Sequence, residues 1–354
     1  MNPVSKLLDA AGGLADSLFL LPPYLSGRFL LQRKVARKDF EAELDFYIEE
    51  GFTARPESFF VLPEKAPAFS VTDEIPFGGG VRQVLSFESG YVAKNPLARP
   101  RHEDYQRNRT AYLVRWVHGD RPRKTVLLLH GLMMGDPRRA EAMFKVPGLF
   151  DAGLDLALAV APFHWLRSPR KAARRHPPIR PQDPALTAEF VGQAMRDVFS
   201  AVAILESLGS PEMGVIGASL GGYLGGLLAA LSEKPRFVAL MVPAVNFLSP
   251  LGPDSFPLDF PVDPGLRRKI HEVFAFHSPA RFLPKLPRED ILIVASRGDR
   301  LCPFENVRDL CEKWGNPPHH FLPGGHWLVF DPKARGRAWY ELLARKGFLP
   351  KKER

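Results

Sequence analysis

Residues 212–231 read EMGVIGASLGGYLGGLLAAL. The part before Ser219 is almost continuously apolar, which is typical of a strand covered on both faces of a sheet, and the glycine-rich part after it is helix-like. A tight turn between the two strains the backbone of Ser219, so the residues two before and two after must be small. Gly217 and Gly221 meet that demand. The stretch predicts a strand, a sharp turn and a helix, with Ser219 exposed as a nucleophile; a helix cap is its alternative role.

Similar apolar runs occur along the chain at 125–130, 155–161, 237–244 and 291–296. Helix-like segments separate or follow them at 184–208, 220–232, 304–314 and 333–345. Two runs that alternate apolar and polar residues, 81–89 and 110–118, are typical of half-exposed strands near a sheet edge. This order of strands and helices predicts an α/β fold with a mostly parallel central sheet and helices on both faces.

Residues 1–79 and the stretch at about 248–289 do not follow this alternation of strands and helices. Residues 1–79 are expected to form an N-terminal helical extension, with one helix near the start and another within 27–50. Residues 80–354 are expected to form the domain that carries Ser219. Within it, the proline-rich stretch at about 248–289 is expected to be a lid-like insertion, because loops this long in compact folds usually have a function.

Composition narrows the classes of function. The chain has 354 residues, of which 45 % are hydrophobic and 25 % charged, and this balance excludes a fibrous or disordered protein. The net charge of +9 favours anionic surfaces or substrates, but without a zinc-finger or aromatic-basic pattern no nucleic-acid partner is expected. The ten histidines lack metal-ligand spacing, so we expect no metal and no other cofactor. We see no signal for an oligomeric state.

The cysteines and the N-terminal stretch bear on location. Cys302 and Cys311 make no disulfide framework, so a cytoplasmic setting is expected. The first 31 residues are apolar, but Asp9, Asp16 and two prolines interrupt them well before the ~20 residues that a membrane span needs. We expect a soluble helix there. A peripheral membrane contact stays open as an alternative, since its leucines and phenylalanines suit an interface.

Two more candidates follow Ser219 in the chain. Asp299 comes directly after the apolar run 291–296, and His326 follows two glycines in PGGHW. A serine hydroxyl needs an imidazole to take its proton, and a carboxylate on the far ring nitrogen fixes the tautomer of that imidazole. A turn residue and a structural histidine are the alternative roles. The backbone N–H groups of Leu132 and Leu220 are the candidate oxyanion donors.

These motifs together resemble the α/β-hydrolase superfamily: HG after one strand, GASLG after another, then a GD-containing turn and GGH. The resemblance spans roughly residues 80–345, and APFHW and GASLGGY are similar to an abhydrolase-domain subgroup. It implies the α/β-hydrolase fold and a serine hydrolase that acts on an acyl bond. Residue by residue, it places the nucleophile on Ser219, the acid on Asp299 and the base on His326.

The expected substrate is a small-molecule or lipid ester, with an anionic ester as one form. Met133, Phe163 and Trp165 are candidates for an acyl pocket. Arg167 opens a basic connection that also contains Arg170, Lys171, Arg174, Arg175 and Arg180, which could hold an anionic group; a solvated loop is the plainer alternative. Peptidase or acyltransferase chemistry on the same three residues and a non-catalytic binding scaffold are the competing functions.

Overall fold

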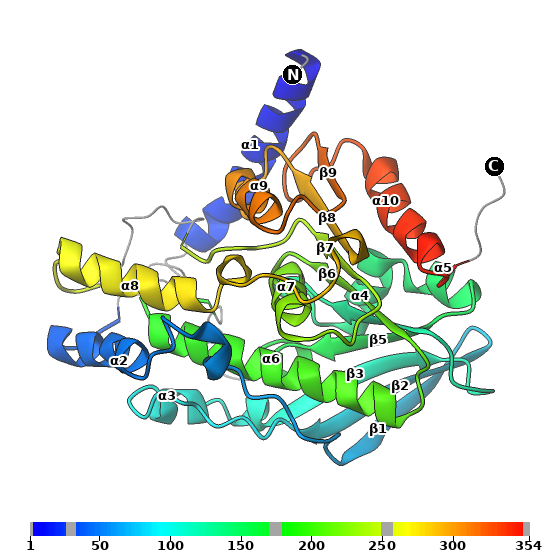
Figure 1. Cartoon of the computed structure of the whole chain (residues 1–354), viewed down its shortest axis with the longest axis horizontal. Coiled ribbons are helices and arrows are strands. Elements are labelled where there is room, and N and C mark those ends of the chain that lie inside the picture. The colour runs from blue at the N-terminus through cyan, green and yellow to red at the C-terminus, as the bar shows by residue number, and fades with distance from the viewer. Residues whose placement is uncertain (1–2, 26–32, 170–178, 181, 249–257, 350–354) are drawn as a thin grey trace.

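The computed structural model describes residues 3–25, 33–169, 179–180, 182–248 and 258–349 (Figure 1). Over these residues, nine strands form one sheet in the order β1-β2-β3-β5-β4-β6-β7-β8-β9. The strands are β1 (Phe69–Phe77), β2 (Gly80–Glu88), β3 (Thr110–Val117), β4 (Thr125–Leu129), β5 (Asp155–Val160), β6 (Met213–Ala218), β7 (Val238–Met241), β8 (Ile291–Ser296) and β9 (His319–Leu322). Pairing is antiparallel from β1 to β5 and parallel from there to β9. The predicted α/β fold with a mostly parallel sheet is confirmed.

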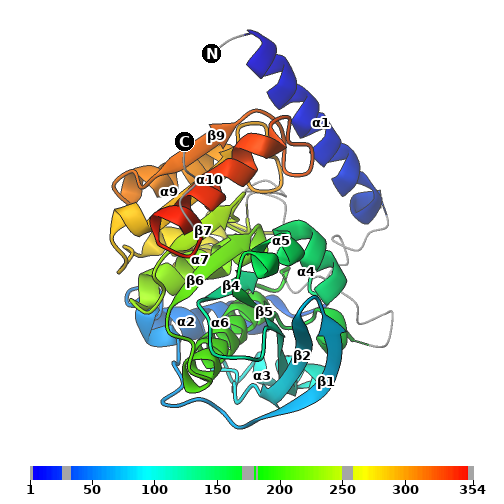
Figure 2. The same ribbon diagram turned by 90° about the vertical axis from the view of Figure 1, so that its right-hand side faces the viewer.

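Helices cover both faces of the sheet (Figure 2). They are α1 (Pro3–Leu25), α2 (Arg37–Glu49), α3 (Arg99–Glu103), α4 (Pro137–Phe144), α5 (Val146–Asp151), α6 (Pro184–Ser207), α7 (Leu220–Leu231), α8 (Pro264–Phe276), α9 (Phe304–Lys313) and α10 (Pro332–Arg345), with short 3-10 turns η1 (Pro56–Phe59), η2 (Gln106–Arg109), η3 (Trp165–Arg167), η6 (Pro279–Arg281) and η7 (Arg288–Asp290). Buried side chains of α2, α6, α7, α8 and α9 form one hydrophobic core. Those of α4, α5 and α10 form a second core on the other face.

The central strands are apolar because both of their faces are covered. Every residue of β4, β5, β6, β7 and β8 is buried, as the continuous apolar runs predicted. The exposed edge strand β1 was not predicted, and it places the first strand of the sheet before residue 80. It pairs with β2 through the turn at Gly78 and Gly79 and is exposed at most of its positions, so its sequence carries no core pattern.

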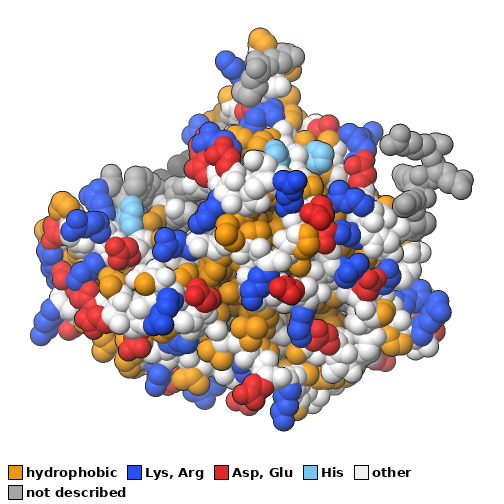
Figure 3. All heavy atoms as spheres, in the orientation of Figure 1, with side chains coloured by type: hydrophobic (Ala, Val, Ile, Leu, Met, Phe, Trp, Pro, Cys, Tyr) orange, Lys and Arg blue, Asp and Glu red, His pale blue; other side chains and the backbone are white. Residues whose placement is uncertain are grey.

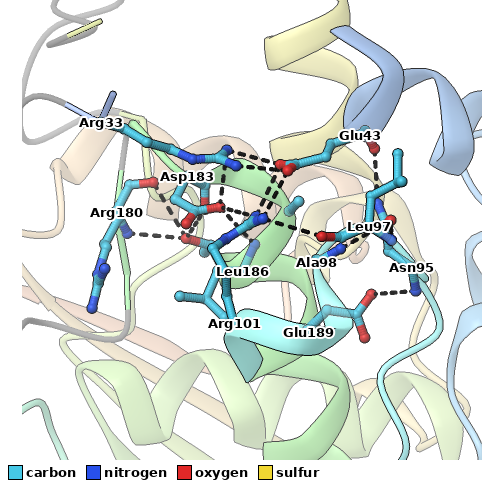
Figure 4. A network of polar contacts seen from close by, with 12 residues as sticks. Arg33, Glu43, Asn95, Leu97, Ala98, Arg101, Arg180, Asp183, Leu186 and Glu189 are labelled. Carbon is cyan, nitrogen blue, oxygen red and sulfur yellow. Dashed lines mark hydrogen bonds and ion pairs between the residues drawn. The ribbon is translucent and has the colours of Figure 1, made fainter. Parts of the chain in front are cut away.

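Helix α2, in the part of the chain expected to be an extension, is held against α3 and α6 by largely buried ion pairs (Figure 4). The Glu43 carboxylate lies 2.6 Å from Arg33 and 2.8 Å from Arg101. Arg101 also reaches Asp183, which caps the first turn of α6 by accepting from the Leu186 N–H at 3.1 Å. The extension is thereby packed against α3 and the start of α6 by ion pairs largely shielded from water.

The proline-rich insertion is partly helical. Residues 249–257 lie outside the described residues, and α8 follows them and packs against α2 and α6. Asp263 caps α8 through the Leu266 N–H at 2.9 Å. Among the described residues, none of the helices combines the length and the apolar character that crossing a bilayer requires.

Candidate active site

Ser219 stands at the sharp turn between β6 and α7, with backbone angles φ 55° and ψ −114°. This is a strained conformation for a residue with a side chain. The flanking glycines make it sterically feasible: a Cβ on Gly217 would lie 2.1 Å from the Gly221 carbonyl oxygen, and one on Gly221 would lie 1.8 Å from the Leu129 oxygen. The predicted strand, turn and helix, and the need for glycine at both positions, are confirmed.

Asp299 and His326 meet on loops that follow β8 and β9. The Nδ1 atom of His326 lies 2.7 Å from Oδ2 of Asp299, and both side chains are buried. The other carboxylate oxygen of Asp299 accepts hydrogen bonds from the N–H groups of Leu301 and Cys302, at 2.9 and 2.8 Å. The turn therefore orients the carboxylate, and a proton on Nδ1 leaves Nε2 of the ring as an acceptor.

The environment of His326 favours its protonated form. Burial alone would lower the pKa of His326, but the hydrogen bond and the negative charge of Asp299 raise it well above its ordinary value. Burial also raises the pKa of Asp299, and the hydrogen bond from His326 opposes that rise. The negative charge of Asp299 lies against the ring of His326, so the carboxylate stabilises the imidazolium.

Cys302 lies against both Ser219 and His326, a position that the sequence did not reveal. Its Sγ atom is 3.9 Å from Oγ of Ser219, and burial raises the pKa of the Cys302 thiol. Within the described part of the chain, Ser219 and His326 share no hydrogen bond in this state. Both contact the same thiol, so the hydroxyl and the imidazole are separated by one side chain.

Asp299, Cys302 and His326 are also a group of the kind that binds metals. Their ligand atoms lie within 4.8 Å of one another. However, Nδ1 of His326 is already engaged by Asp299, which is the role that a carboxylate takes beside a catalytic or ligating imidazole alike.

The loop after β4 reaches the same turn. A Cβ on Gly131 would lie 3.4 Å from Cβ of Ser219, so this loop and the turn are in contact. Neither the N–H of Leu132 nor that of Leu220 donates a hydrogen bond to another described residue. Two unpaired donors beside a serine are what an oxyanion needs. Met133 follows on the loop with φ 63° and is 61 % exposed.

The other predicted substrate residues are placed differently. Phe163 is buried, and its ring centroid lies 4.6 Å from that of Tyr105. Trp165 is half-buried against Tyr112, at 6.1 Å between centroids. Both have positive φ values, 68° and 47°, so the turn after β5 is strained, as turns near functional sites often are.

Arg167 has no part of its side chain facing solvent. It lies 2.8 Å from the Asp197 carboxylate and donates to the carbonyl oxygens of Val160 and Asn108, each at 2.8 Å. The Arg167 guanidinium therefore stabilises the turn after β5. Ser219 is not among its partners. Of the other basic residues in that connection, Arg180 donates to the Tyr105 hydroxyl; Arg170, Lys171, Arg174 and Arg175 lie outside the described residues.

His130, at the end of β4, has a structural role. Its Nε2 accepts the N–H of Ala161 at 3.1 Å, and its Nδ1 lies 2.8 Å from the Gly131 oxygen. Burial lowers the pKa of His130 to about 3, so the ring stays neutral and ties β4 to the turn after β5.

Two aspartates of α1 also reach the loops of Asp299 and His326. Asp16 is fully buried and accepts hydrogen bonds from the backbone N–H groups of His326, Trp327 and Arg300. Asp9 accepts from the Gly324 N–H and from Arg297. In the sequence, these aspartates are notable only as charges that interrupt the apolar N-terminal stretch. The signal that could have found them is their spacing of seven residues, which puts them on one face of a helix.

No family model matches this chain. In Mycobacterium tuberculosis, the curated "Uncharacterized protein MT2702" of strain CDC 1551 / Oshkosh is 27 % identical over 326 residues, which cover 88 % of this chain and 76 % of that protein. "Uncharacterized protein Rv2627c" of strain H37Rv is 26 % identical over 326 residues, with the same shares.

Two solved structures resemble the whole architecture. Acetyl xylan esterase 1 from Thermoanaerobacterium sp. JW/SL YS485 matches with a TM-score of 0.54 at 14 % identity, covering 90 % of this chain and 98 % of that one. The acetyl xylan esterase from Paenibacillus sp. R4 matches with a TM-score of 0.55 at 11 % identity, covering 90 % and 99 %. With the sheet order and the turn at Ser219, this likeness shows that the chain has the α/β-hydrolase fold.

Proposed function

We propose that this protein hydrolyses carboxylic esters through an acyl-enzyme formed on Ser219. The observation that carries the proposal is the 2.7 Å contact between His326 Nδ1 and Asp299 Oδ2, inside the fold and beside the strained turn of Ser219. A buried carboxylate that holds an imidazole next to a strained serine suits proton transfer to and from that serine. The name "esterase" on the two similar structures supports the same class of reaction.

The reaction would run in two halves. Oγ of Ser219 attacks the ester carbonyl carbon while Nε2 of His326 takes the hydroxyl proton, and the N–H groups of Leu132 and Leu220 bind the oxyanion. The C–O bond to the alcohol then breaks, and the alcohol leaves with that proton. Water attacks the acyl-enzyme in the same way: His326 accepts its proton and returns it to Ser219 as the acid is released.

The first step needs a hydrogen bond between Ser219 and His326. In this structure Cys302 lies against both groups, so a rotation of the Ser219 side chain, or a small shift of the thiol, has to precede attack. Hydrogen bonds of this kind are often long without substrate and tighten when it binds.

The substrate we favour is a small-molecule or lipid ester. Met133 is exposed beside the Ser219 turn and is our choice for a residue that contacts the acyl chain. Phe163 and Trp165 shape the strained turn after β5, and we assign them to supporting that side of the site. The pairing of Arg167 with Asp197 removes it from our candidates for binding an anionic group.

The first experiment is covalent labelling with a fluorophosphonate probe, alongside turnover of p-nitrophenyl esters of graded chain length. We expect labelling and ester turnover by the native protein, and a loss of about 10⁴-fold or more in kcat for Ser219→Ala. Ser58→Ala, an exposed serine outside the site, is the control and should behave as the native protein does.

The same assays separate the competing functions. Undiminished labelling of Ser219→Ala, or no labelling of the native protein, would leave a non-catalytic scaffold. Faster turnover of aminoacyl anilides than of any ester would instead make the protein a peptidase. Transfer of the acyl group to an added alcohol or amine, faster than its release to water, would make it an acyltransferase.

A further inference from the structure

Helix α1 packs against the domain with its polar side. Asp9, Gly12, Gly13 and Asp16 recur at helical spacing and face inward, and the two glycines and Asp16 are buried. Leu7, Leu14 and Leu18 lie on the opposite side of the helix and are 60–70 % exposed. Most surface helices bury their apolar side. Helix α1 has the reverse orientation, with its polar side buried and its apolar side exposed.

The inward side of α1 accepts hydrogen bonds from both the Asp299 loop and the His326 loop. Oδ2 of Asp16 lies 2.8 Å from the N–H of His326 and 3.1 Å from that of Arg300, the residue after Asp299. Oδ1 of Asp16 accepts from His326 and Trp327, at 3.0 and 3.2 Å. One carboxylate therefore binds backbone donors on the loop of the base and on the loop of the acid, and such charge-assisted bonds are strong.

The backbones approach each other too closely for side chains. A Cβ on Gly12 would lie 2.0 Å from the Gly325 nitrogen, and one on Gly298 would lie 2.1 Å from the Asp9 oxygen. Asp9 adds hydrogen bonds from the Gly324 N–H and from Nε of Arg297, both at 3.0 Å. Contact of this kind leaves little freedom for either loop to shift relative to α1.

We propose that α1 positions the catalytic pair, with Asp16 setting the relative placement of the His326 and Asp299 loops. Asp16 does not touch the reacting atoms, so it is a positioning residue that acts through the backbone of its neighbours. A misplacement of the imidazole by about 1 Å can cost on the order of 100-fold in rate. This inference rests on the proposed function, but the placement itself can be measured without turnover.

The test compares Asp16→Asn and Gly12→Val with the control Lys6→Gln, which changes an exposed side chain of the same helix. The readouts are kcat and KM on a short p-nitrophenyl ester, and the low-field NMR resonance of the His326 Nδ1 proton, assigned by its loss in Asp299→Ala. We expect Asp16→Asn and Gly12→Val to lower kcat by about 10- to 100-fold with little change in KM, and to shift or broaden that resonance. Lys6→Gln should do neither.

The outcomes are separable. If the native protein shows the resonance but turns over no ester, the proposed function fails while the resonance still tests the positioning role. If folded Asp16→Asn and Gly12→Val keep both the native kcat and the native resonance, the positioning role is wrong. Circular dichroism of each variant establishes that it is folded.

The outward side of α1 carries a second, independent inference. Leu7, Leu14 and Leu18 form a row of exposed leucines on the helix, which projects from the body of the molecule (Figures 1 and 3). The loop that Asp16 holds also exposes apolar side chains, with Leu328 at 42 % and Phe330 at 39 %. Exposed apolar patches of this kind on a protein surface mark an interaction site.

We infer that this row of leucines lies in a lipid surface. A lipid surface accepts a single helix face, whereas a stable dimer buries about 1,600 Å² in total, much more than three leucine side chains on each copy would provide. The net charge of +9 favours a surface that contains anionic lipid. Because α1 also holds the loops of Asp299 and His326, the lipid contact would bring the active site to esters in that surface.

Co-sedimentation with phosphatidylcholine vesicles, with and without phosphatidylglycerol, tests this contact. We expect the native protein to sediment with the anionic vesicles, and Leu7→Gln/Leu14→Gln to bind at least about 10-fold more weakly. Leu283→Gln, which alters a leucine that is 67 % exposed elsewhere, is the matched control. Absence of vesicle binding by the native protein would overturn the inference. So would a native dimer that the double variant turns into a monomer, since a second copy would then be the partner.

Discussion

At the scale of single residues, the protonation of His326 controls the proposed reaction. The hydrogen bond and the negative charge of Asp299 raise the pKa of His326 against the effect of burial, and only the neutral imidazole can act as the base. We therefore expect kcat for ester hydrolysis to rise with pH through an apparent pKa above 6.5. Asp299→Asn removes the charge that stabilises the imidazolium, so the same limb should move to lower pH while kcat falls by about 10⁴.

The measurement is kcat against pH for the native protein, and the rate of fluorophosphonate labelling against pH for both the native protein and the slow Asp299→Asn variant, so that the two limbs are compared by one observable. Asp309→Asn, which removes an exposed carboxylate on α9, is a control for general charge effects and should leave the profile in place. A native limb at or below 6.5, or one that Asp299→Asn does not move, would contradict this account of His326.

Cys302 raises the question of which nucleophile reacts. Its thiol is 3.9 Å from the Ser219 hydroxyl, yet burial raises its pKa and so disfavours the thiolate. Cys302→Ala should therefore keep kcat within about 10-fold of the native value, in contrast to the loss of about 10⁴ for Ser219→Ala. Cys311→Ala, a buried cysteine on α9, is the control. Loss of ester turnover in Cys302→Ala, with turnover kept in Ser219→Ala, would make the thiol the nucleophile.

At the scale of elements, α2 depends on one carboxylate. Glu43 lies between Arg33 and Arg101, and its removal would leave two largely buried guanidinium groups without that partner. Because Asp183 still pairs with both guanidinium groups, we expect Glu43→Ala to lower the free energy of unfolding by about 1–3 kcal/mol. Asp39→Asn, on the exposed side of the same helix, should change it by no more than about 0.5 kcal/mol. Urea unfolding measures both free energies. If Glu43→Ala loses no more than Asp39→Asn does, the ion pairs of Glu43 do not stabilise α2, and its apolar side alone holds it.

At the scale of the whole molecule, the elements that could be predicted from the sequence are those that are buried. The strands β4 to β8 and the turn at Ser219 were predictable because a strand covered on both faces is apolar throughout, and because a strained turn requires glycine at set positions. Strand β1 was not, since it lies exposed at an edge. Nor was α8, whose start follows a proline-rich run.

Several charged residues near the site are buried, and their burial could not be predicted from the sequence. Arg167 sits in a basic run that reads as exposed, and only the fold shows that Asp197 and two carbonyl oxygens enclose it. Asp9 and Asp16 carry no sign of burial in the sequence, because charged residues on helices usually face water. A tertiary contact between residues 16 and 326 leaves no local pattern in either segment.

The whole molecule should also lose stability in mild acid through its buried histidines. Burial lowers the pKa of His130 and His277 to about 3 and that of His164 to about 4, whereas an unfolded histidine titrates near 6.5. Between these values the unfolded chain binds protons that the folded chain does not, so this contribution is complete above about pH 6.5 and is lost as pH falls. Each histidine should cost about 1–2 kcal/mol of unfolding free energy by pH 5.

The buried carboxyls Glu189 and Asp197 act in the opposite direction, since burial raises the pKa of each, and they reduce the net slope in the same range. Urea unfolding between about pH 7.5 and 4.5 measures the balance. His164→Asn keeps a donor for the Pro162 oxygen but cannot be protonated, so it should flatten the dependence by the share of one histidine. His320→Gln alters an exposed ring and should not. If His164→Asn reproduces the native slope, the buried imidazoles are not what makes the fold sensitive to acid.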